Sequence, residues 1–269
     1  MTRLWTDMTS RDFGQVDPET WVALLPVAAI EQHGPHLPVS VDADINAGVV
    51  EAAAARLDGD APVVILPMQS IGKSNEHMAF PGTLTLRLET LVGLWTDIGE
   101  SVARAGFRKL VFLNSHGGQP QVVDIVARDL RVRLGMLAVA ASTYGFGKPQ
   151  GLFSDEEAHF GIHAGEIETS MMMHLRPQAV RRELLADFIS GAAEIEHEYA
   201  LLRAEGAVGM GWMTQDLNPD GAVGDARNSD PERGRLCVEH AGEKLAALLM
   251  EVSRYPLSRL KPGPLGAGR

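Results

Sequence analysis

Short apolar runs alternate along the first half of the chain with segments in which apolar residues recur every three or four positions. The runs have the length of buried strands, which are predicted at residues 22–30, 61–66, 109–114 and 136–141. The periodic segments predict helices at residues 45–57, 88–106 and 122–134. Because the runs are apolar throughout and are separated by helices, they predict a mainly parallel sheet that is covered on both faces.

The second half of the chain is less regular. Residues 143–162 and 206–231 are rich in glycine and polar residues and predict long loops. Further helices are predicted at residues 164–175, 188–204 and 235–253. Since no linker or repeat divides the sequence, we expect one α/β domain over residues 1–269. Its three layers should follow the order α/β/α, with a flexible tail at 258–269.

The composition excludes several classes of protein. The 269 residues are 45% hydrophobic and carry a net charge of −11, and such an acidic surface disfavours nucleic acid, which binds to basic footprints. The single cysteine, Cys237, excludes an internal disulfide and fits a reducing compartment. No stretch approaches the ~20 apolar residues of a membrane span or the apolar segment of a signal peptide. We therefore expect a cytoplasmic protein with a small-molecule substrate that binds neither nucleic acid nor membranes.

Metal-ligand side chains follow the first predicted strand. Glu31 and His33 come directly after the apolar run, and residues two apart in an extended chain point to the same side. Asp42 follows a short loop with glycine and proline and can return to the same place. Because open α/β sheets place their sites at the carboxyl ends of strands, we expect these three side chains in one crevice. This set of ligands suits zinc or manganese.

A second polar cluster follows the strand predicted at 109–114. His116 stands before Gly117 and Gly118, and the two glycines let a ligand approach the backbone and its free N–H groups closely. His116 can therefore face the same crevice as the first cluster. Taken alone, this cluster is equally typical of a turn with a capping histidine.

A third cluster opens the helix predicted at 164–175. It contains His163, Glu166 and Glu168, and acidic residues in a first turn also suit the helix dipole. Glu166 and Glu168 lie about 200° apart on a helix of 3.6 residues per turn. Only one of them is therefore expected to face the site, and the choice between the two stays open at this point.

Together, the three clusters supply more ligands than one zinc ion usually takes from a protein. The five candidates are Glu31, His33, Asp42, His116 and Glu168. They suit two metal ions about 3.5–4 Å apart that share a bridging carboxylate. With Asp42 as the bridge, one ion takes Glu31 and His116, and the other takes His33 and Glu168. Two divalent cations then balance three carboxylates and one hydroxide.

The motifs that carry these residues resemble the creatininase (creatinine amidohydrolase) family. The matching stretches are Glu31-Gln-His-Gly-Pro-His-Leu-Pro, Asn-Ser-His116-Gly-Gly and His163-Ala-Gly-Glu-Ile-Glu168-Thr-Ser, with further support at 72–83 and 221–225. The resemblance covers roughly residues 5–250. It implies a single α/β domain with a binuclear site, commonly assembled into a homohexamer. It also implies metal ligands at the five positions above and an acid/base histidine at His163.

The sequence departs from creatinine-hydrolysing members around the substrate. Those members carry a Tyr-Glu pair where this chain has Gly117 and Gly118, and they place tryptophans between the third strand and the catalytic helix. None of the four tryptophans of this chain lies in that stretch. Glu76 and His77 could line the site or a subunit contact, but a structural role is the preferred interpretation. The residues assigned to the substrate are Ser74, Gly117, Gly118 and His159.

The expected function is metal-dependent hydrolysis of a C–N bond in a small cyclic amide, creatinine or a similar compound. A metal-bound hydroxide attacks the carbonyl carbon, because bound metal lowers the pKa of water to about 7. His163 protonates the departing nitrogen. Zinc and manganese both fit the ligands. Three alternatives remain open: a formamide deformylase, a precursor-peptide peptidase on the same metal core, and a non-catalytic binding protein of the same fold.

Overall fold

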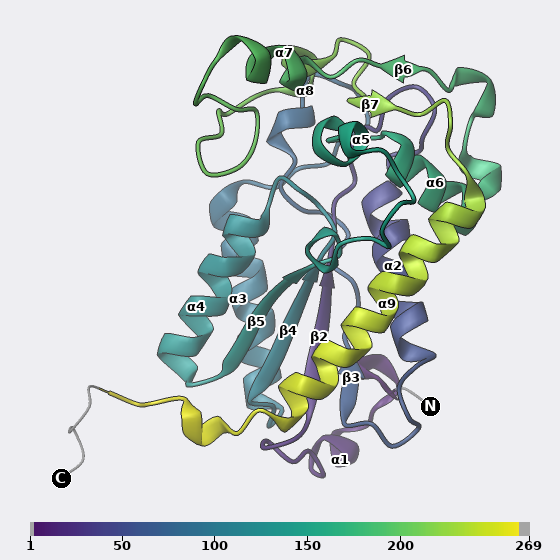
Figure 1. Ribbon diagram of the computed structural model, residues 1–269. Helices are drawn as coiled ribbons and strands as arrows, with labels where there is room; N and C mark the ends of the chain where they lie inside the picture. The colour runs from purple at the N-terminus through teal and green to yellow at the C-terminus, as the bar shows by residue number, and fades with distance from the viewer. Residues whose placement is uncertain (1–2, 264–269) are drawn as a thin grey trace.

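Parallel strands form the central sheet of the computed structural model, which describes residues 3–263 (Figure 1). Their spatial order is β1-β3-β2-β4-β5, and every neighbouring pair is parallel. The strands are β1 (Arg3–Leu4), β2 (Val22–Val27), β3 (Val63–Ile65), β4 (Lys109–Asn114) and β5 (Leu137–Ser142). The mainly parallel sheet expected from the sequence is confirmed. The two-residue β1 was not expected, because it is too short to show a pattern.

Alternate side chains of the strands enter two hydrophobic clusters, one on each face of the sheet. On β2, Val22 and Leu24 belong to one cluster, whereas Ala23 and Leu25 belong to the other. Successive side chains of a strand point to opposite faces, so a strand that is covered on both sides is apolar at every position. All six residues of β2 are buried for this reason.

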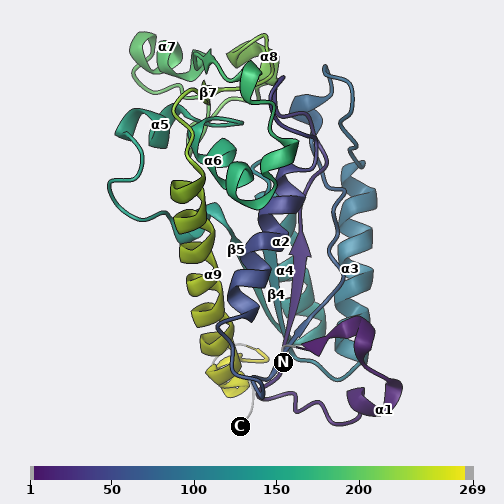
Figure 2. The ribbon, with the colours of Figure 1, turned by 90° about the vertical axis from the view of Figure 1, so that its right-hand side faces the viewer.

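Helices cover both faces of the sheet and produce the three layers expected from the sequence (Figures 1 and 2). On one face lie α2 (Val41–Ala54) and α9 (Pro231–Arg254), with α6 (Glu166–Leu175) packed against both. On the other face lie α3 (Leu88–Arg104) and α4 (Pro120–Leu134), which contact each other. Each connection from a strand to the helix after it leaves the sheet at the carboxyl ends of the strands.

Short elements form a cap over these carboxyl ends, at the top of Figure 1. Two of them, β6 and β7, pair in antiparallel fashion. The cap consists of α5 (Asp155–Phe160), β6 (Asp187–Phe188), α7 (Gly191–Glu198), α8 (Thr214–Leu217) and β7 (Gly224–Asp225). The cap closes the end of the sheet at which the polar clusters of the sequence lie.

The cap is also where the structure differs from the predicted elements. The loop predicted at 143–162 contains α5, which begins where the Ser154 hydroxyl accepts a backbone N–H at 3.0 Å. The helix predicted at 188–204 is reduced to α7, because the Arg203 guanidinium donates to three backbone carbonyls in the segment that follows and holds it as a loop. The loop predicted at 206–231 contains α8 and β7. Elements this short carry no periodic pattern.

The remaining short elements lie between the main ones and at the ends of the described range. They are α1 (Ser10–Phe13) and 3-10 helices at Trp5–Asp7, Asn75–His77, Tyr144–Phe146, Pro177–Ala179, Arg182–Leu184 and Leu257–Arg259. Of the tail predicted to be flexible at 258–269, residues 264–269 lie outside the described residues. Within residues 3–263, no helix combines the length and the apolar character that a membrane crossing requires.

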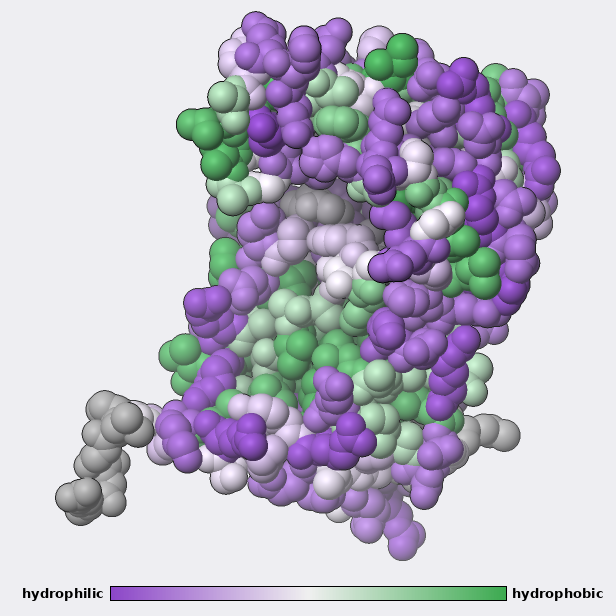
Figure 3. All heavy atoms as spheres, viewed as in Figure 1, coloured by the Kyte–Doolittle hydropathy of each residue, from purple (hydrophilic) through white to green (hydrophobic). Residues whose placement is uncertain are grey.

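One edge of the sheet is apolar and only partly covered. The edge strand β5 has five apolar residues among its six, and each of the six is half-buried or exposed. Figure 3 shows hydrophobic residues gathered between α4 and α9, where β5 lies. An open strand edge of this kind offers backbone and apolar groups to another chain.

A lysine stands at the first position of the buried strand β4. Lys109 has no exposed surface, and its Nζ donates to the carbonyls of Val252, Ser253 and Tyr255 at 2.9, 2.6 and 2.7 Å. These carbonyls lie at the end of α9, where the regular bonds of the helix run out; that of Val252 also accepts the backbone N–H of Tyr255 at 3.2 Å. The ammonium group therefore ties α9 to β4 and faces the negative end of the helix dipole.

Replacing Lys109 with methionine should lower the stability of the fold. The three carbonyls would lose their buried donor, so we expect the free energy of unfolding to fall by about 1–3 kcal/mol in urea denaturation followed by circular dichroism. Lys244→Met, at an exposed position of α9, is the control and should change it by less than about 0.5 kcal/mol. Equal stability of the two variants would contradict the role given to Lys109.

Candidate metal centre

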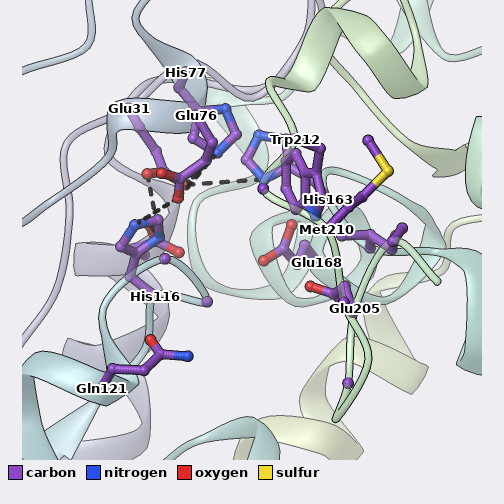
Figure 4. A pocket seen from close by; sticks show the side chains of 18 residues that line it. Glu31, Glu76, His77, His116, Gln121, His163, Glu168, Glu205, Met210 and Trp212 are labelled. Carbon is purple, nitrogen blue, oxygen red and sulfur yellow. Dashed lines mark ion pairs between the residues drawn. The ribbon is translucent and has the colours of Figure 1, made fainter. Parts of the chain in front are cut away.

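The five predicted ligands converge at the carboxyl ends of β2 and β4. Glu31 and His33 lie just beyond β2, and His116 lies just beyond β4. Asp42 is in the first turn of α2, and Glu168 is in the first turn of α6. Figure 4 shows Glu31, His116 and Glu168 around the same cavity. Four different segments of the chain therefore meet at one place, as open α/β sheets allow.

The ligand atoms form two groups that share one carboxylate. In the first group, His116 Nδ1 lies 3.1 Å from Glu31 Oε2 and 3.5 Å from Asp42 Oδ2. In the second group, His33 Nε2 lies 3.9 Å from both Asp42 Oδ1 and Glu168 Oε2. Within each group, all three ligand atoms lie within 4.8 Å of one another. Asp42 offers one oxygen to each group, which is the geometry of a bridging carboxylate.

Backbone carbonyls determine which nitrogen of each histidine faces the carboxylates. A carbonyl oxygen only accepts, so the nitrogen beside it carries the proton. Nδ1 of His33 donates to the carbonyl of Glu31 at 3.0 Å, and Nε2 of His116 donates to the carbonyl of Lys73 at 2.8 Å. In the neutral rings, the opposite nitrogens face the carboxylates as lone pairs. Metal-binding histidines in proteins are oriented in this way.

Three buried atoms of the cluster have no hydrogen-bond partner among the described residues. They are Glu31 Oε2, His33 Nε2 and Asp42 Oδ2, and each belongs to a residue with at most 3% of its surface exposed. Burying acceptors that face other acceptors costs free energy unless a cation lies between them. The residues therefore fit the divalent metals that their ligand types indicate.

The pKa values of two side chains in the cluster are raised, because buried carboxylates lie close together without a cation. Burial, and then the charge of Glu31, raise the pKa of Asp42 well above its usual range. Burial by itself lowers the pKa of His116, but the charge and hydrogen bond of the adjacent Glu31 raise that pKa well above its ordinary value. A proton on Asp42 or His116 thus supplies charge where a metal would supply it. Metal binding and protonation compete at such sites for this reason.

His163 borders the two groups. Its Nε2 donates to the backbone carbonyl of Gln32 at 2.7 Å, so its Nδ1 is a lone pair that lies 3.9 Å from Glu31 Oε1. The ring lies between those of His33 and His77, at centroid distances of 4.1 and 4.2 Å. Burial, and then the neighbouring His33, lower the pKa of His163 to about 4, so the ring is neutral at pH 7. Nδ1 is also close enough to Glu31 and His33 to form a ligand group with them.

The backbone before α6 is strained at this site. Ala164 has a φ of 55°, in the left-handed region that side chains other than glycine rarely adopt. Its N–H donates to Glu168 Oε2 at 2.6 Å, and His163 exchanges backbone hydrogen bonds with Val223 of the cap. The strained turn aims both His163 and Glu168 at the cavity. Strain of this kind is commonly found at functional sites.

Two residues for which a structural role was preferred also face the cavity. Glu76 and His77 lie in the 3-10 helix between β3 and α3, where Glu76 Oε1 is 3.2 Å from His116 Nε2 and His77 Nε2 is 3.3 Å from Glu31 Oε1. In the sequence, the only indication of this role was the adjacent acid and histidine, Glu76 and His77, within the motif at 72–83. No local pattern shows that this segment folds over the end of β4, so the tertiary structure was needed to place it.

Three residues considered from the sequence lie away from the cavity. His159 is in α5, where its Nε2 pairs with Glu196 at 2.9 Å and its side chain is 61% exposed. It was expected near the substrate, but its helix turns it toward α7 and solvent. Ser74 is fully buried behind the histidine that follows β4 and does not line the cavity. Glu166 pairs with Arg233 at 2.6 Å, so Glu168 is the acid of α6 that reaches the site.

The cluster occupies one side of a cavity of about 430 Å³. Gly117 and Gly118 line it, as expected. The facing wall is the loop between α7 and α8 and carries Glu205, Met210 and Trp212 (Figure 4). No tryptophan lies between β4 and α6, but the fold brings Trp212 to the cavity from a later segment. The volume lies in the range of small-ligand sites.

A family model named Creatininase and described as creatinine amidohydrolase matches residues 6–249. The chain belongs to the creatininase family. The mycofactocin precursor peptide peptidase of Mycobacterium ulcerans (strain Agy99) is 29% identical over 255 residues, which cover 93% of this chain and 90% of that protein. The creatinine amidohydrolase of Pseudomonas putida is 31% identical over 182 residues, 62% of this chain and 68% of that protein. This creatininase-family hydrolase therefore has both amidohydrolases and peptidases among its relatives.

Solved creatininase structures share the fold. A crystal structure of creatinine amidohydrolase (creatininase) has a TM-score of 0.74 at 25% identity, and the match covers 93% of this chain and 97% of that one. Structures named "Creatininase Mn" and "Zn-Zn type" mutant creatininase have TM-scores of 0.74 and 0.73 at 24% identity, each over 93% of this chain and 98% of the other. The creatininase-like α/β fold expected from the sequence is thus confirmed.

A side chain at Gly118 tests whether Glu76 supports the metal centre. A Cβ at Gly118 would collide with the Glu76 carboxylate and crowd Nε2 of His116, whereas a Cβ at Gly117 meets no atom within 4 Å. Gly118→Ala should therefore weaken zinc binding by about 10–100-fold in calorimetric titration of metal-free protein, because it displaces the carboxylate beside His116, a candidate ligand. Gly117→Ala is the matched control and should bind zinc like the unmodified protein. The same affinity in both variants would show that Glu76 has no such role.

Proposed function

We propose that this protein is a hydrolase that uses two divalent metal ions, zinc or manganese, to cleave a C–N bond in a small cyclic amide. The observation that carries the proposal is the pair of ligand groups that share Asp42, with unpaired buried acceptors turned toward each other. Five protein ligands in two groups suit a binuclear site better than a single zinc. The manganese and Zn-Zn forms among the creatininase structures support this choice of metals.

In this proposal, each ion has its own pair of ligands. Glu31 and His116 would hold one ion, His33 and Glu168 would hold the other, and Asp42 would bridge them. When bound, the ions supply a water of lowered pKa and polarise the carbonyl group of the amide. The backbone carbonyls beside the two histidines hold the rings in place before any metal arrives. Rings held in this way need little rearrangement on binding.

His163 is the proposed acid/base residue. The carbonyl of Gln32 holds its Nε2–H, so Nδ1 can accept a proton within the cavity and return it to the departing nitrogen. The ring is buried between two other imidazoles, which limits exchange of that proton with bulk water. A ring with a defined tautomer always presents the same atom to the substrate.

The cyclic amide is supported by the relative that is a creatinine amidohydrolase and by the moderate size of the cavity. Removal of residues from a precursor peptide is the second candidate, because the relative that is a precursor peptide peptidase matches over 93% of this chain. Assembly into a homo-oligomer, hexameric by family resemblance, would cover the apolar edge of β5.

The single domain over 1–269 and the cytoplasmic location stay predictions.

A substrate panel tests the proposed reaction. Protein loaded with zinc or manganese is incubated with creatinine, other lactams, N-formyl amides and short peptides, and products are followed by mass spectrometry. We expect hydrolysis of a cyclic amide, its loss after removal of the metal with a chelator, and its recovery when metal is returned. Hydrolysis of peptides alone would replace the cyclic amide with the peptidase function. No product in any class, from protein that holds two ions per chain, would overturn the hydrolase proposal.

Removal of the His163 ring should separate catalysis from metal binding. His163→Ala is expected to keep two ions per chain by elemental analysis and to lose about 10²–10⁴-fold in kcat, because it lacks the group that transfers the proton. His174→Ala, at an exposed position of α6, is the control and should leave both quantities unchanged. Loss of an ion from His163→Ala would instead make His163 a ligand.

A further inference from the structure

Gln32 contacts two histidines that face each other in the cavity wall. Its side-chain Nε2 lies 2.8 Å from Nδ1 of His77, and its backbone carbonyl oxygen lies 2.7 Å from Nε2 of His163. The two contacts have opposite polarity, because an amide nitrogen only donates and a carbonyl oxygen only accepts. One residue therefore determines where the proton sits on both neutral rings.

Two backbone groups establish which end of the Gln32 amide is nitrogen. Its Oε1 accepts the N–H of Gly34 at 3.0 Å, and its Nε2 donates to the carbonyl of Gly221 at 2.8 Å. If the amide were turned over, its nitrogen would face the N–H of Gly34, placing two donors together. Its oxygen would face the carbonyl of Gly221, placing two acceptors together. The hydroxyl of Thr214 lies 2.8 Å from Nδ1 of His77 and 2.9 Å from the carbonyl oxygen of Glu76, so its one proton can go to either acceptor. The amide nitrogen of Gln32, in contrast, can only donate. The amide thus makes Nδ1 of His77 an acceptor.

A neutral imidazole that accepts at Nδ1 carries its single proton at Nε2. Nε2 of His77 lies 3.3 Å from Glu31 Oε1 and 4.0 Å from Glu76 Oε1, and it makes no aligned hydrogen bond with any described residue. His77 also lines the cavity (Figure 4). Its N–H is therefore available to a bound molecule, although the ring is otherwise held on its opposite side.

His77 and His163 present opposite groups to the cavity. His163 turns the lone pair of Nδ1 inward because its N–H is held by the Gln32 carbonyl, whereas His77 turns its N–H inward. The ring centroids are 4.2 Å apart and the planes are inclined by 33°. Neighbouring rings that offer a donor and an acceptor can contact the oxygen and the nitrogen of one amide group.

We propose that His77 is a second catalytic histidine, which donates its Nε2–H to the carbonyl oxygen of the substrate while Nδ1 of His163 serves the nitrogen. The inference rests on the proposed function, because it adds a residue to the same reaction. A donor aimed at an oxygen on which negative charge develops lowers the barrier, and removing one such donor typically reduces kcat by about 10²–10³-fold. Gln32 is the positioning residue that keeps the proton of His77 on the cavity side.

Nitrogen-15 NMR of protein labelled at histidine tests the proton position without substrate or metal. We expect the His77 signals to show a protonated Nε2 and an unprotonated Nδ1, with His77→Gln used to assign them. In Gln32→Glu the proton should move to Nδ1, because a carboxylate can only accept. A proton on Nδ1 of His77 in the unmodified protein would overturn the proposal.

Acetate, the simplest carboxylate product of an amide hydrolysis, probes the donor by binding. Zinc-loaded protein is titrated with acetate as the unmodified chain, as His77→Phe, which has no donor, and as His77→Gln, which keeps an N–H. His77→Phe should raise the Kd about 10-fold through loss of one hydrogen bond to a charged acceptor, and His77→Gln should restore most of the affinity. Zinc content by elemental analysis should be the same in all three.

The remaining outcomes separate this inference from the proposed function. Equal acetate affinity in His77→Phe and the unmodified protein would overturn the inference. Loss of zinc from His77→Phe would also overturn it, by making His77 a support for Glu31. If no member of the substrate panel is hydrolysed but His77→Phe weakens acetate binding, the hydrolase proposal fails and the assignment of His77 as a donor stands.

Discussion

Histidine rings held by backbone carbonyls, with their lone pairs turned toward buried carboxylates, are the arrangement on which the site depends. His33, His116 and His163 each give their proton to a carbonyl and present the other nitrogen to the cavity. Acceptors then face acceptors on buried side chains, which is unfavourable until a cation is added. The same arrangement raises the pKa of Asp42 and His116, because a proton is the cation available without metal.

The cost of burying these acceptors is consistent with several features of the surrounding fold. A left-handed residue at Ala164 and a buried cluster of polar side chains both lower stability. The two apolar clusters on the faces of the sheet and the covered strand β2 offset that cost. The polar groups are restricted to the carboxyl ends of the strands, where loops can reach them without interrupting the sheet. Site and core are therefore kept in different parts of one scaffold.

The candidate metal ligands and the residues on the opposite wall of the cavity come from different parts of the molecule. The ligands follow strands or open helices that also build the core, so packing of the sheet and helices defines their positions. The facing wall comes from the loop between α7 and α8, which contributes Glu205 and Trp212, whereas His77 comes from the segment between β3 and α3 and lies beside Glu31. Short cap elements can change without disturbing the sheet. This division is consistent with relatives that carry the names of a peptidase and an amidohydrolase.

The sequence by itself determined the parallel sheet, its main helices and four of the candidate ligands, Glu31, His33, Asp42 and His116, because each of these leaves a local pattern. Buried strands are apolar at every position, amphipathic helices repeat every three or four residues, and ligands follow strand ends in recognisable motifs. Only the tertiary structure decided that Glu168 and not Glu166 reaches the cavity, that His159 is exposed, and that His77 and Trp212 line the cavity. These outcomes depend on contacts between segments far apart in the chain, for which neighbouring residues hold no periodic signal.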